Sequence, residues 1–292
     1  MISVITVNFN QTALTLDLLQ SCQQWEGQEL ECIVVDNASE ENPTERILSQ
    51  FPEVSVLVQT DNRGYAAGLN IGMQAARGDY FLLLNNDTLV TANMLDHLLA
   101  VFQEQADVGI VSPKICYANQ PNRVQYAGMT LLHPITGRNR MIGHQQIEAG
   151  HWNHRSQTGY AHGAAMMLSR ESWETVGPMD ESYFLYYEEL DWSARFRKAG
   201  YSIWCEGKTK ILHRVSASVG EGNPIKSFYY YRNRRKFMRS HQTAFSYSLF
   251  LVYSFVIMYP LALLRHFRKP AHLRAIIQSM FAPTNRLPQQ GQ

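Results

Sequence analysis

Short apolar runs alternate with longer segments of mixed apolar and polar residues over the first 115 residues of the chain. Runs of strand length, rich in β-branched residues, occupy residues 2–7, 32–35, 54–58, 80–84 and 108–111. The segments between them have the length and pattern of amphipathic helices, at residues 14–22, 43–51, 65–76 and 94–102. Strands that alternate with helices predict βαβ units, and therefore an α/β fold with a Rossmann-like, mostly parallel sheet covered by helices on both faces.

This alternation stops after residue 115. Residues 116–160 are rich in His, Asn, Gln, Arg and Gly and have no clear period, so we expect them to cross the sheet edge and to form one wall of a binding site. A further strand is predicted at residues 163–168, followed by a helix at residues 170–176. Residues 188–200 have the pattern of an amphipathic helix that ends at a glycine.

Asn and Asp residues gather where the first four predicted strands end. The side chains in these positions are Asn8, Asn10, Asp36, Asn62, Asn85, Asn86 and Asp87. In any single loop, such residues are explained equally well by turns and helix N-caps. Because the carboxyl ends of parallel strands meet at one edge of a sheet, four such loops together predict a polar ligand at that edge.

Asp87 follows a strand that the sequence predicts to be buried. Its carboxylate, together with the side-chain carbonyl of Asn85 two residues earlier, can offer two hard oxygen ligands to a divalent cation such as Mg²⁺ or Mn²⁺. His213 follows the short run Lys210, Ile211 and Leu212. A lone histidine after a strand is commonly structural, so His213 gains weight only in combination with Asp87.

Three carboxylates, Glu188, Glu189 and Asp191, lie within four residues beside several aromatic residues. They repel one another, so in a partly dry site at least one of them has a raised pKa. Such a carboxylate near a hydroxyl group can act as a general base. The alternative is a helix N-terminus, where the macrodipole favours acidic residues.

Charge divides the chain into two parts. Residues 1–221 carry 15 Lys and Arg and all 25 Asp and Glu, whereas residues 222–292 carry 11 Lys and Arg and no acidic residue. An acidic folded part argues against a nucleic-acid-binding protein, so the basic part needs a different partner. With 45% hydrophobic and 17% charged residues, a disordered chain is excluded.

Within the basic part, residues 242–264 contain no charged residue and are long enough to span a bilayer core. Ser246, Ser248, Ser254 and Pro260 interrupt the segment, and Lys and Arg flank both of its ends, so the positive-inside rule gives no orientation. We expect this segment to lie on an anionic membrane surface. The alternative is a helix that packs in a homodimer interface.

Two features of the sequence bear on the compartment. The N-terminus lacks the basic and apolar regions of a signal peptide. The four cysteines, Cys22, Cys32, Cys116 and Cys205, are scattered without metal-site or disulfide spacing, which is typical of a reducing compartment. We therefore expect a cytoplasmic protein that lies peripherally at the inner face of the cell membrane.

Six stretches occur in an order that resembles a known family: residues 4–10, 33–39, 62–72, 83–87, 163–167 and 184–192. The chain resembles the family-2 inverting glycosyltransferases of the GT-A fold, and within them the bacterial rhamnosyltransferase-like branch. The resemblance covers about residues 1–240. It implies a GT-A domain over residues 1–240, with a nucleotide-binding half at 1–115 and an acceptor half at 116–240, and it leaves 241–292 as a membrane-associating tail.

The resemblance implies roles for the residues at the strand ends. Asp36 is similar to the residue that binds the base or ribose of the nucleotide, with Asn8 and Asn10 in the same pocket. The nucleotide would also lie beside Asn62, Gly64, Asn70 and Asn86.

The metal site and the catalytic base are implied in the same way. Asp87 would be the main metal ligand, with Asn85 and His213 beside it. Because Asn85 stands where the family has an aspartate, we expect a lower metal affinity. Glu189 occupies the position of the family's catalytic base, and Glu188 and Asp191 stay open as alternatives.

The function implied by the resemblance is transfer of a sugar, with rhamnose as the first expectation, from a dTDP- or UDP-sugar. The acceptor would be a hydroxyl of a glycan or of a lipid-linked glycan, and the transfer would invert the anomeric configuration. One alternative is a catalytically silent nucleotide-sugar-binding or membrane scaffold protein with the same fold. A nucleotidyltransferase ranks last, because residues 8–11 are neither basic nor glycine-rich.

Overall fold

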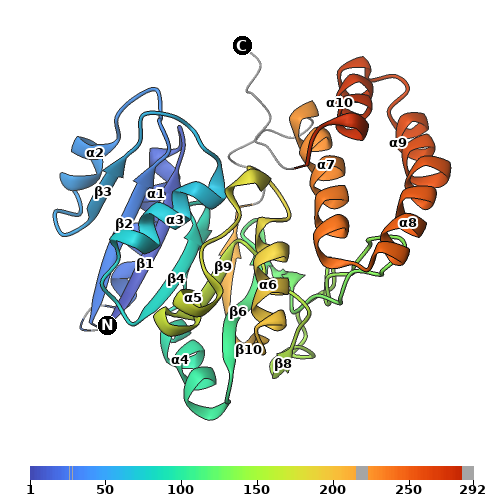
Figure 1. The fold of residues 1–292 in the computed structure, drawn as a ribbon. Coiled ribbons are helices and arrows are strands. Elements are labelled where there is room, and N and C mark those ends of the chain that lie inside the picture. Colours follow the sequence, from blue (N-terminus) through green and yellow to red (C-terminus); the bar gives the residue numbers. More distant parts are fainter. Residues whose placement is uncertain (26, 28, 215–222, 285–292) are drawn as a thin grey trace.

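The computed structural model describes residues 1–25, 27, 29–214 and 223–284. A ten-stranded sheet forms the centre of the protein (Figure 1). The strand order is β3-β2-β1-β4-β9-β6-β10-β5, with β7 paired to β6 and β8 paired to β10. The strands are β1 (Ile2–Asn8), β2 (Leu30–Asp36), β3 (Ser55–Val58), β4 (Tyr80–Asn85), β5 (Thr88–Leu89), β6 (Val108–Tyr117), β7 (Gln120–Tyr126), β8 (Arg155–Gln157), β9 (Ala165–Ser169) and β10 (Ser202–His213).

Helices cover both faces of this sheet, and a further group of helices follows it. The helices of the sheet domain are α1 (Thr12–Cys22), η1 (Gln23–Trp25), α2 (Thr44–Leu48), α3 (Tyr65–Ala75), α4 (Met94–Glu104), α5 (Arg170–Val176), η2 (Glu181–Tyr183) and α6 (Glu188–Lys198). The C-terminal helices are α7 (Pro224–His241), α8 (Ala244–Tyr253), η3 (Ser254–Met258), α9 (Tyr259–Arg265) and α10 (Pro270–Phe281).

The N-terminal half confirms the predicted α/β fold. Strands β1 to β4 are parallel to one another, and neighbouring residues along each strand point to opposite faces of the sheet. Val4 belongs to the core shared with α1 and α4, whereas Ile5 belongs to the core shared with α3. Helix α3 lies so close to β1 that a Cβ atom at Gly72 would be 2.3 Å from the Ile5 side chain, which only glycine allows.

The second half of the sheet differs from the sequence prediction. Strand β9 is antiparallel to both of its neighbours, β4 and β6, so the sheet is mixed in this half. Strand β10 begins at Ser202, although the sequence analysis indicated only the short run 210–212. Charged residues in the earlier part of this strand interrupt the apolar pattern, so the sequence did not predict that part. Glu206 is fully buried there, and its charge is compensated by an ion pair of 2.8 Å with Arg155.

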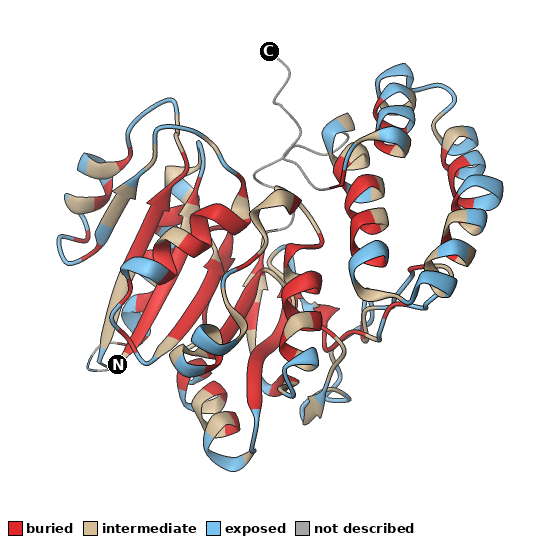
Figure 2. Cartoon of the chain, in the orientation of Figure 1, coloured by how far each residue is buried: buried red, intermediate tan, exposed pale blue. Residues whose placement is uncertain are grey.

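The C-terminal helices stand beside the sheet domain, and α10 packs along α7 (Figure 1). Helices α8, η3 and α9 form one helical run, Ala244–Arg265, that is long and apolar enough to cross a membrane, and its most apolar 18-residue window has a mean hydropathy of 1.9. Only 28% of its most apolar window is buried within the protein. Most of the surface of this run is exposed or half-buried, in contrast to the buried strands (Figure 2).

Helix α7, from the C-terminal helices, is hydrogen-bonded to a strained loop of the sheet domain, residues 183–187. In this loop Phe184, Tyr186 and Tyr187 have φ angles of 58°, 65° and 75°, a backbone conformation that residues other than glycine rarely adopt. The buried amide of Asn233 on α7 donates hydrogen bonds of 2.7, 2.7 and 2.9 Å to the carbonyls of residues 183, 185 and 186. These bonds offset the backbone strain and fix the start of α6.

We predict that Asn233→Ala destabilises the protein by about 1–3 kcal/mol, because buried carbonyls lose their donors. Thermal unfolding followed by circular dichroism measures this change as a lower Tm. Asn119→Ala, in the exposed turn between β6 and β7, is the matched control and should leave the Tm unchanged. Equal Tm values for both variants would contradict the proposed role of Asn233.

Candidate functional site

A cavity of about 1200 Å³ opens at the carboxyl ends of β1 and β4. The register of the sheet explains why these ends meet, since Asn8 is paired with Asp36, and Val7 is paired with both Val35 and Asn85. Eight of the predicted site residues line the cavity, namely Asn62, Gly64, Asn85, Asn86, Asp87, Glu188, Glu189 and His213. The structure therefore brings together side chains from four separate regions of the sequence.

The other predicted nucleotide residues do not line the cavity. Asp36 is fully buried, and its carboxylate accepts hydrogen bonds from the Asn8 amide (2.7 Å) and from the hydroxyl (2.6 Å) and backbone N–H (3.0 Å) of Ser39. Asn10 has a φ of 55° and accepts a hydrogen bond of 2.8 Å from the backbone of Glu40. These three side chains shape the loops at the ends of β1 and β2.

Asn70 also bonds within the protein. Its amide oxygen accepts from the backbone N–H of Met179, and its amide nitrogen donates to the carbonyl of the same residue, both at 2.9 Å. Helix α3 is thereby tied to the chain that leads into loop 183–187.

Asp87 and His213 form a buried pair with Asp87 Oδ1 and His213 Nε2 3.2 Å apart. Gln125 Oε1 lies 2.8 Å from His213 Nδ1, and because a carbonyl oxygen can only accept, Nδ1 carries the proton. His213 Nε2 is the ring nitrogen that faces Asp87 Oδ1. Asp87 Oδ1 itself is buried and has no hydrogen-bond partner in the described part of the chain.

Sequence reasoning missed several polar residues of the cavity. Gln125 and His162 come from the region around residues 116–160, where no periodic signal exists. Burial, together with the neighbouring His213 and His144, lowers the pKa of His162 to about 3, so its ring is neutral. Asn37 is adjacent to Asp36 in the same Asx-rich strand end, and that position was a usable signal.

The C-terminal helices contribute cations that the sequence analysis did not place here. Lys226 of α7 and Arg274 of α10 both line the cavity. The lining of this cavity therefore includes side chains from the basic part of the chain.

Glu188 and Glu189 begin α6 and face the cavity. Each has one buried carboxylate oxygen, Oε2, without a hydrogen-bond partner among the described residues. Burial raises the pKa of Glu189 to about 7, although backbone N–H groups at the helix start lower it. Burial, and then the charge of Glu189, raise the pKa of Glu188 well above its usual value.

Asp191 is held differently from the two glutamates. Its carboxylate accepts from His241 Nε2 at 2.7 Å, from Arg195 Nε at 3.0 Å and from the Tyr183 hydroxyl at 3.2 Å. It does not line the cavity. Of the three acidic residues, only Glu188 and Glu189 are therefore placed to meet a ligand there.

Loop 183–187 also packs closely against Gly64 and Tyr65, which line the cavity. A Cβ atom at Gly64, where φ is 89°, would be 2.6 Å from the Phe184 carbonyl oxygen. The backbone N–H of Tyr65 donates to that same carbonyl at 3.2 Å. Glycine at position 64 is therefore required by both its conformation and this close approach.

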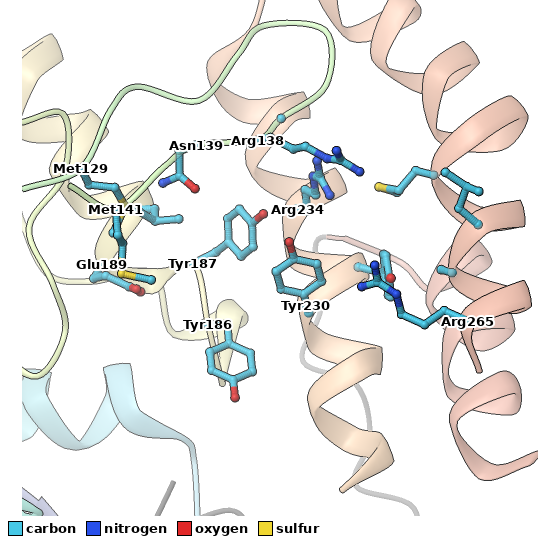
Figure 3. A pocket seen from close by; sticks show the side chains of 16 residues that line it. Met129, Arg138, Asn139, Met141, Tyr186, Tyr187, Glu189, Tyr230, Arg234 and Arg265 are labelled. Atoms are coloured by element: carbon cyan, nitrogen blue, oxygen red, sulfur yellow. The ribbon is translucent and has the colours of Figure 1, made fainter. Parts of the chain in front are cut away.

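A second cavity of about 730 Å³ adjoins the first (Figure 3). Four residues line both cavities, namely Met129, Met141, Tyr186 and Glu189. Glu189 is the carboxylate at this junction, whereas Glu188 lines the first cavity only. A group that enters from the second cavity would meet Glu189 before it reaches Asp87.

Comparison with known proteins identifies the family of this arrangement. A family profile described as "Glycosyl transferase family 2" matches residues 3–175. A similar protein is the "Low-salt glycan biosynthesis hexosyltransferase Agl10" of Haloferax volcanii, 26% identical over 217 residues, which cover 72% of this chain and 67% of that protein. Another is the "N-acetylglucosaminyl-diphospho-decaprenol L-rhamnosyltransferase" of Mycobacterium tuberculosis, 23% identical over 208 residues, which cover 64% of this chain and 67% of that protein.

Among solved structures, the chain is similar to GalNAc-T7 with UDP, GalNAc and Mn²⁺. The TM-score is 0.64 at 15% sequence identity, and the match covers 90% of this chain and 59% of that chain. This likeness shows the fold.

We predict that Glu189→Gln raises the Tm at pH 8 and leaves it nearly unchanged at pH 4.5. A carboxyl group whose pKa is raised in the folded state costs stability only where the unfolded chain loses the proton, so the cost grows between pH 4.5 and about 7 and persists above. Melting curves at the two pH values measure it. The exposed Glu174→Gln on α5 is the matched control, and a Glu189→Gln effect of equal size at both pH values would contradict the prediction.

Proposed function

The chain belongs to glycosyl transferase family 2 and transfers sugar from a nucleotide donor, and on this premise we propose a specific reaction. The protein transfers a hexosyl or deoxyhexosyl group, with rhamnose as the first candidate, to a hydroxyl of a lipid-linked glycan with inversion. One observation carries the proposal: Glu189 and the Asp87–His213 pair face the same cavity. A base and a site for the leaving diphosphate are both needed for a single-displacement transfer.

Support for a lipid-linked acceptor and for rhamnose comes from the name of the Mycobacterium tuberculosis relative, which specifies both. A pyrimidine nucleotide is the first candidate for the donor, in the form of a dTDP- or UDP-sugar. Asn62, Gly64 and Asn86 line the part of the cavity beside the strand ends, where the nucleotide would lie. Asp36, Asn8, Asn10 and Asn70 would act by holding the loops around it.

The residues at Asp87 fit a divalent cation. Asp87 Oδ1 and His213 Nε2 face each other at 3.2 Å, and a carboxylate oxygen and an imidazole nitrogen in this arrangement could both bind one cation. In the described part of the chain no group of three or more His, Cys, Asp and Glu side chains could hold a metal by itself. Asn85 would complete the protein ligands, and Mg²⁺ or Mn²⁺ bound there would neutralise charge on the departing diphosphate.

The proposed mechanism uses Glu189 as the general base. The acceptor hydroxyl oxygen attacks the anomeric carbon, its proton passes to the Glu189 carboxylate, and the bond from the anomeric carbon to the diphosphate oxygen breaks. The nucleoside diphosphate leaves from the face opposite to the attack, so the configuration inverts. A base with a pKa of about 7 is about half ionised at neutral pH, and its ionised form accepts a proton effectively.

We propose that the helical run Ala244–Arg265 lies on the membrane. Its exposed apolar side chains include Val252 (62% exposed), Val256 (68%) and Leu264 (68%). Arg and Lys residues flank the run on both sides, which suits the anionic inner face of the cell membrane. The enzyme would then be a peripheral cytoplasmic protein, with residues 1–240 as the GT-A domain and 241–292 as the tail.

Glu189→Gln and Asp87→Asn should impair the enzyme in different ways. Loss of the base lowers kcat by about 10²–10⁴ and leaves the affinity for dTDP or UDP unchanged. Loss of the Asp87 charge weakens nucleotide binding in Mg²⁺ by about tenfold. Calorimetry with dTDP, UDP and GDP measures binding, and nucleoside-diphosphate release with a membrane glycolipid fraction measures turnover. In the wild type, kcat should fall about tenfold per pH unit below pH 7.

Asp61→Asn, an exposed change at the same sheet edge, is the control and should alter neither property. Full turnover by Glu189→Gln together with an inactive Glu188→Gln would show that Glu188 is the base. Tighter binding of GDP than of dTDP or UDP would overturn the pyrimidine assignment. Nucleotide binding without turnover on any glycolipid would favour the silent scaffold protein.

Replacing Val252, Val256 and Leu264 by serine should reduce sedimentation with anionic vesicles at least tenfold, because each buried apolar side chain contributes about 1–2 kcal/mol. Raising the salt from 0.1 M to 0.5 M should weaken the wild type without abolishing binding. The control variant carries serine at the exposed residues Val58, Leu131 and Ile147, which lie outside the tail. If wild type and both variants sediment equally, the proposed membrane surface is wrong.

A further inference from the structure

The second cavity carries an excess of positive charge that the proposed reaction does not yet use. Three arginines line it: Arg138 from the loop before β8, Arg234 from α7 and Arg265 from the end of α9. Glu189 is the carboxylate among its described lining residues. In the described part of the chain, none of the three guanidinium groups has an ion pair with an acidic residue.

Arg234 is the buried cation of this cavity. The residue is 2% exposed, and its Nη2 donates to the carbonyl of Thr136. Its Nε is buried and has no partner within the described residues, so one donor remains unsatisfied. Gly137, with a φ of 57°, lets the loop approach, since a Cβ atom there would be 3.1 Å from that same Nε. An unpaired buried cationic donor favours an anionic ligand.

The chemistry of the lining changes in order along the cavity (Figure 3). Glu189 lies at one side, and Tyr187 and Tyr230 lie between it and the arginines, with their ring centroids 6.1 Å apart. The Arg234 guanidinium is 6.0 Å from the centre of the Tyr230 ring. Met258, Leu261 and Ala262, which also line the cavity, form an apolar part of its lining that belongs to the run Ala244–Arg265.

We propose that this second cavity binds the phosphate group of a lipid-linked acceptor, with Arg138, Arg234 and Arg265 as its ligands. The inference rests on the proposed function, because it places the acceptor hydroxyl at Glu189. The sugar then lies against Tyr187 and Tyr230, the phosphate against the arginines, and the lipid chain along α9. This order matches a sugar joined through phosphate to a lipid whose chain leads to the exposed apolar surface of Leu264.

Binding of farnesyl diphosphate to the full-length protein tests this proposal, measured by calorimetry with saturating UDP and Mg²⁺ so that the donor cavity is occupied. The wild type should bind farnesyl diphosphate at least tenfold more tightly than inorganic pyrophosphate or farnesol, because only this probe carries both chemistries. Arg138→Gln and Arg265→Gln should each weaken it about tenfold. Both residues are exposed, so the variants should fold.

Arg268→Gln is the matched control, since Arg268 lies three residues after Arg265, is exposed and does not line the cavity. It should leave binding of farnesyl diphosphate unchanged. Equal weakening by Arg268→Gln would show a general charge effect and overturn the proposal. Equally tight binding of inorganic pyrophosphate, or of monomeric dihexanoyl phosphatidylglycerol as a lipid headgroup, would also overturn it.

The same experiment separates this proposal from the proposed function. If UDP binds but farnesyl diphosphate does not, the acceptor site is wrong and the donor site stands. If neither UDP nor dTDP binds, the proposed function fails first.

Discussion

The hydrogen bonds from Asn233 to loop 183–187 are the constraint on which the rest of the site depends. The loop holds three non-glycine residues with positive φ, a conformation that costs free energy unless the surroundings fix it. Once fixed, it packs Phe184 against Gly64 on one side and starts α6 with Glu188 and Glu189 on the other. Because the donor of these bonds is on α7, the C-terminal helices and the sheet domain share one site.

Glu189 connects the two cavities of this site, and burial sets its acid–base character. Its carboxylate lines the cavity at the strand ends and also the cavity between the sheet domain and α9. The same C-terminal helices that expose an apolar surface supply Lys226 and Arg274 to the first cavity and Arg234 and Arg265 to the second. The basic charge of the tail is therefore directed in part toward the site, in addition to any membrane surface.

The sequence predicted the first half of the fold well because the apolar runs there are continuous. Strands such as β4 are buried on both faces, and a buried parallel strand needs apolar residues throughout. The prediction was poorer for β10 and β7, because their charged and polar residues are compensated by partners far away in the chain. The buried charge of Glu206, for example, is compensated by an ion pair with Arg155, and no local sequence pattern predicts such a pair.

The sequence by itself also determined which residue types would meet at the carboxyl edge of the sheet, including Asn62 and Asp87, because the carboxyl ends of parallel strands share one edge. Glu189 was expected in the site only because residues 184–192 resemble a known family. The tertiary structure decided how each of them is used. Asp36 and Asp191 are occupied by several hydrogen bonds, whereas Glu189 keeps a carboxylate oxygen without a hydrogen-bond partner among the described residues and Asp87 Oδ1 contacts His213, and both carboxylates line a cavity. This difference depends on burial and on partners distant in sequence, which the spacing of residues along a chain does not encode.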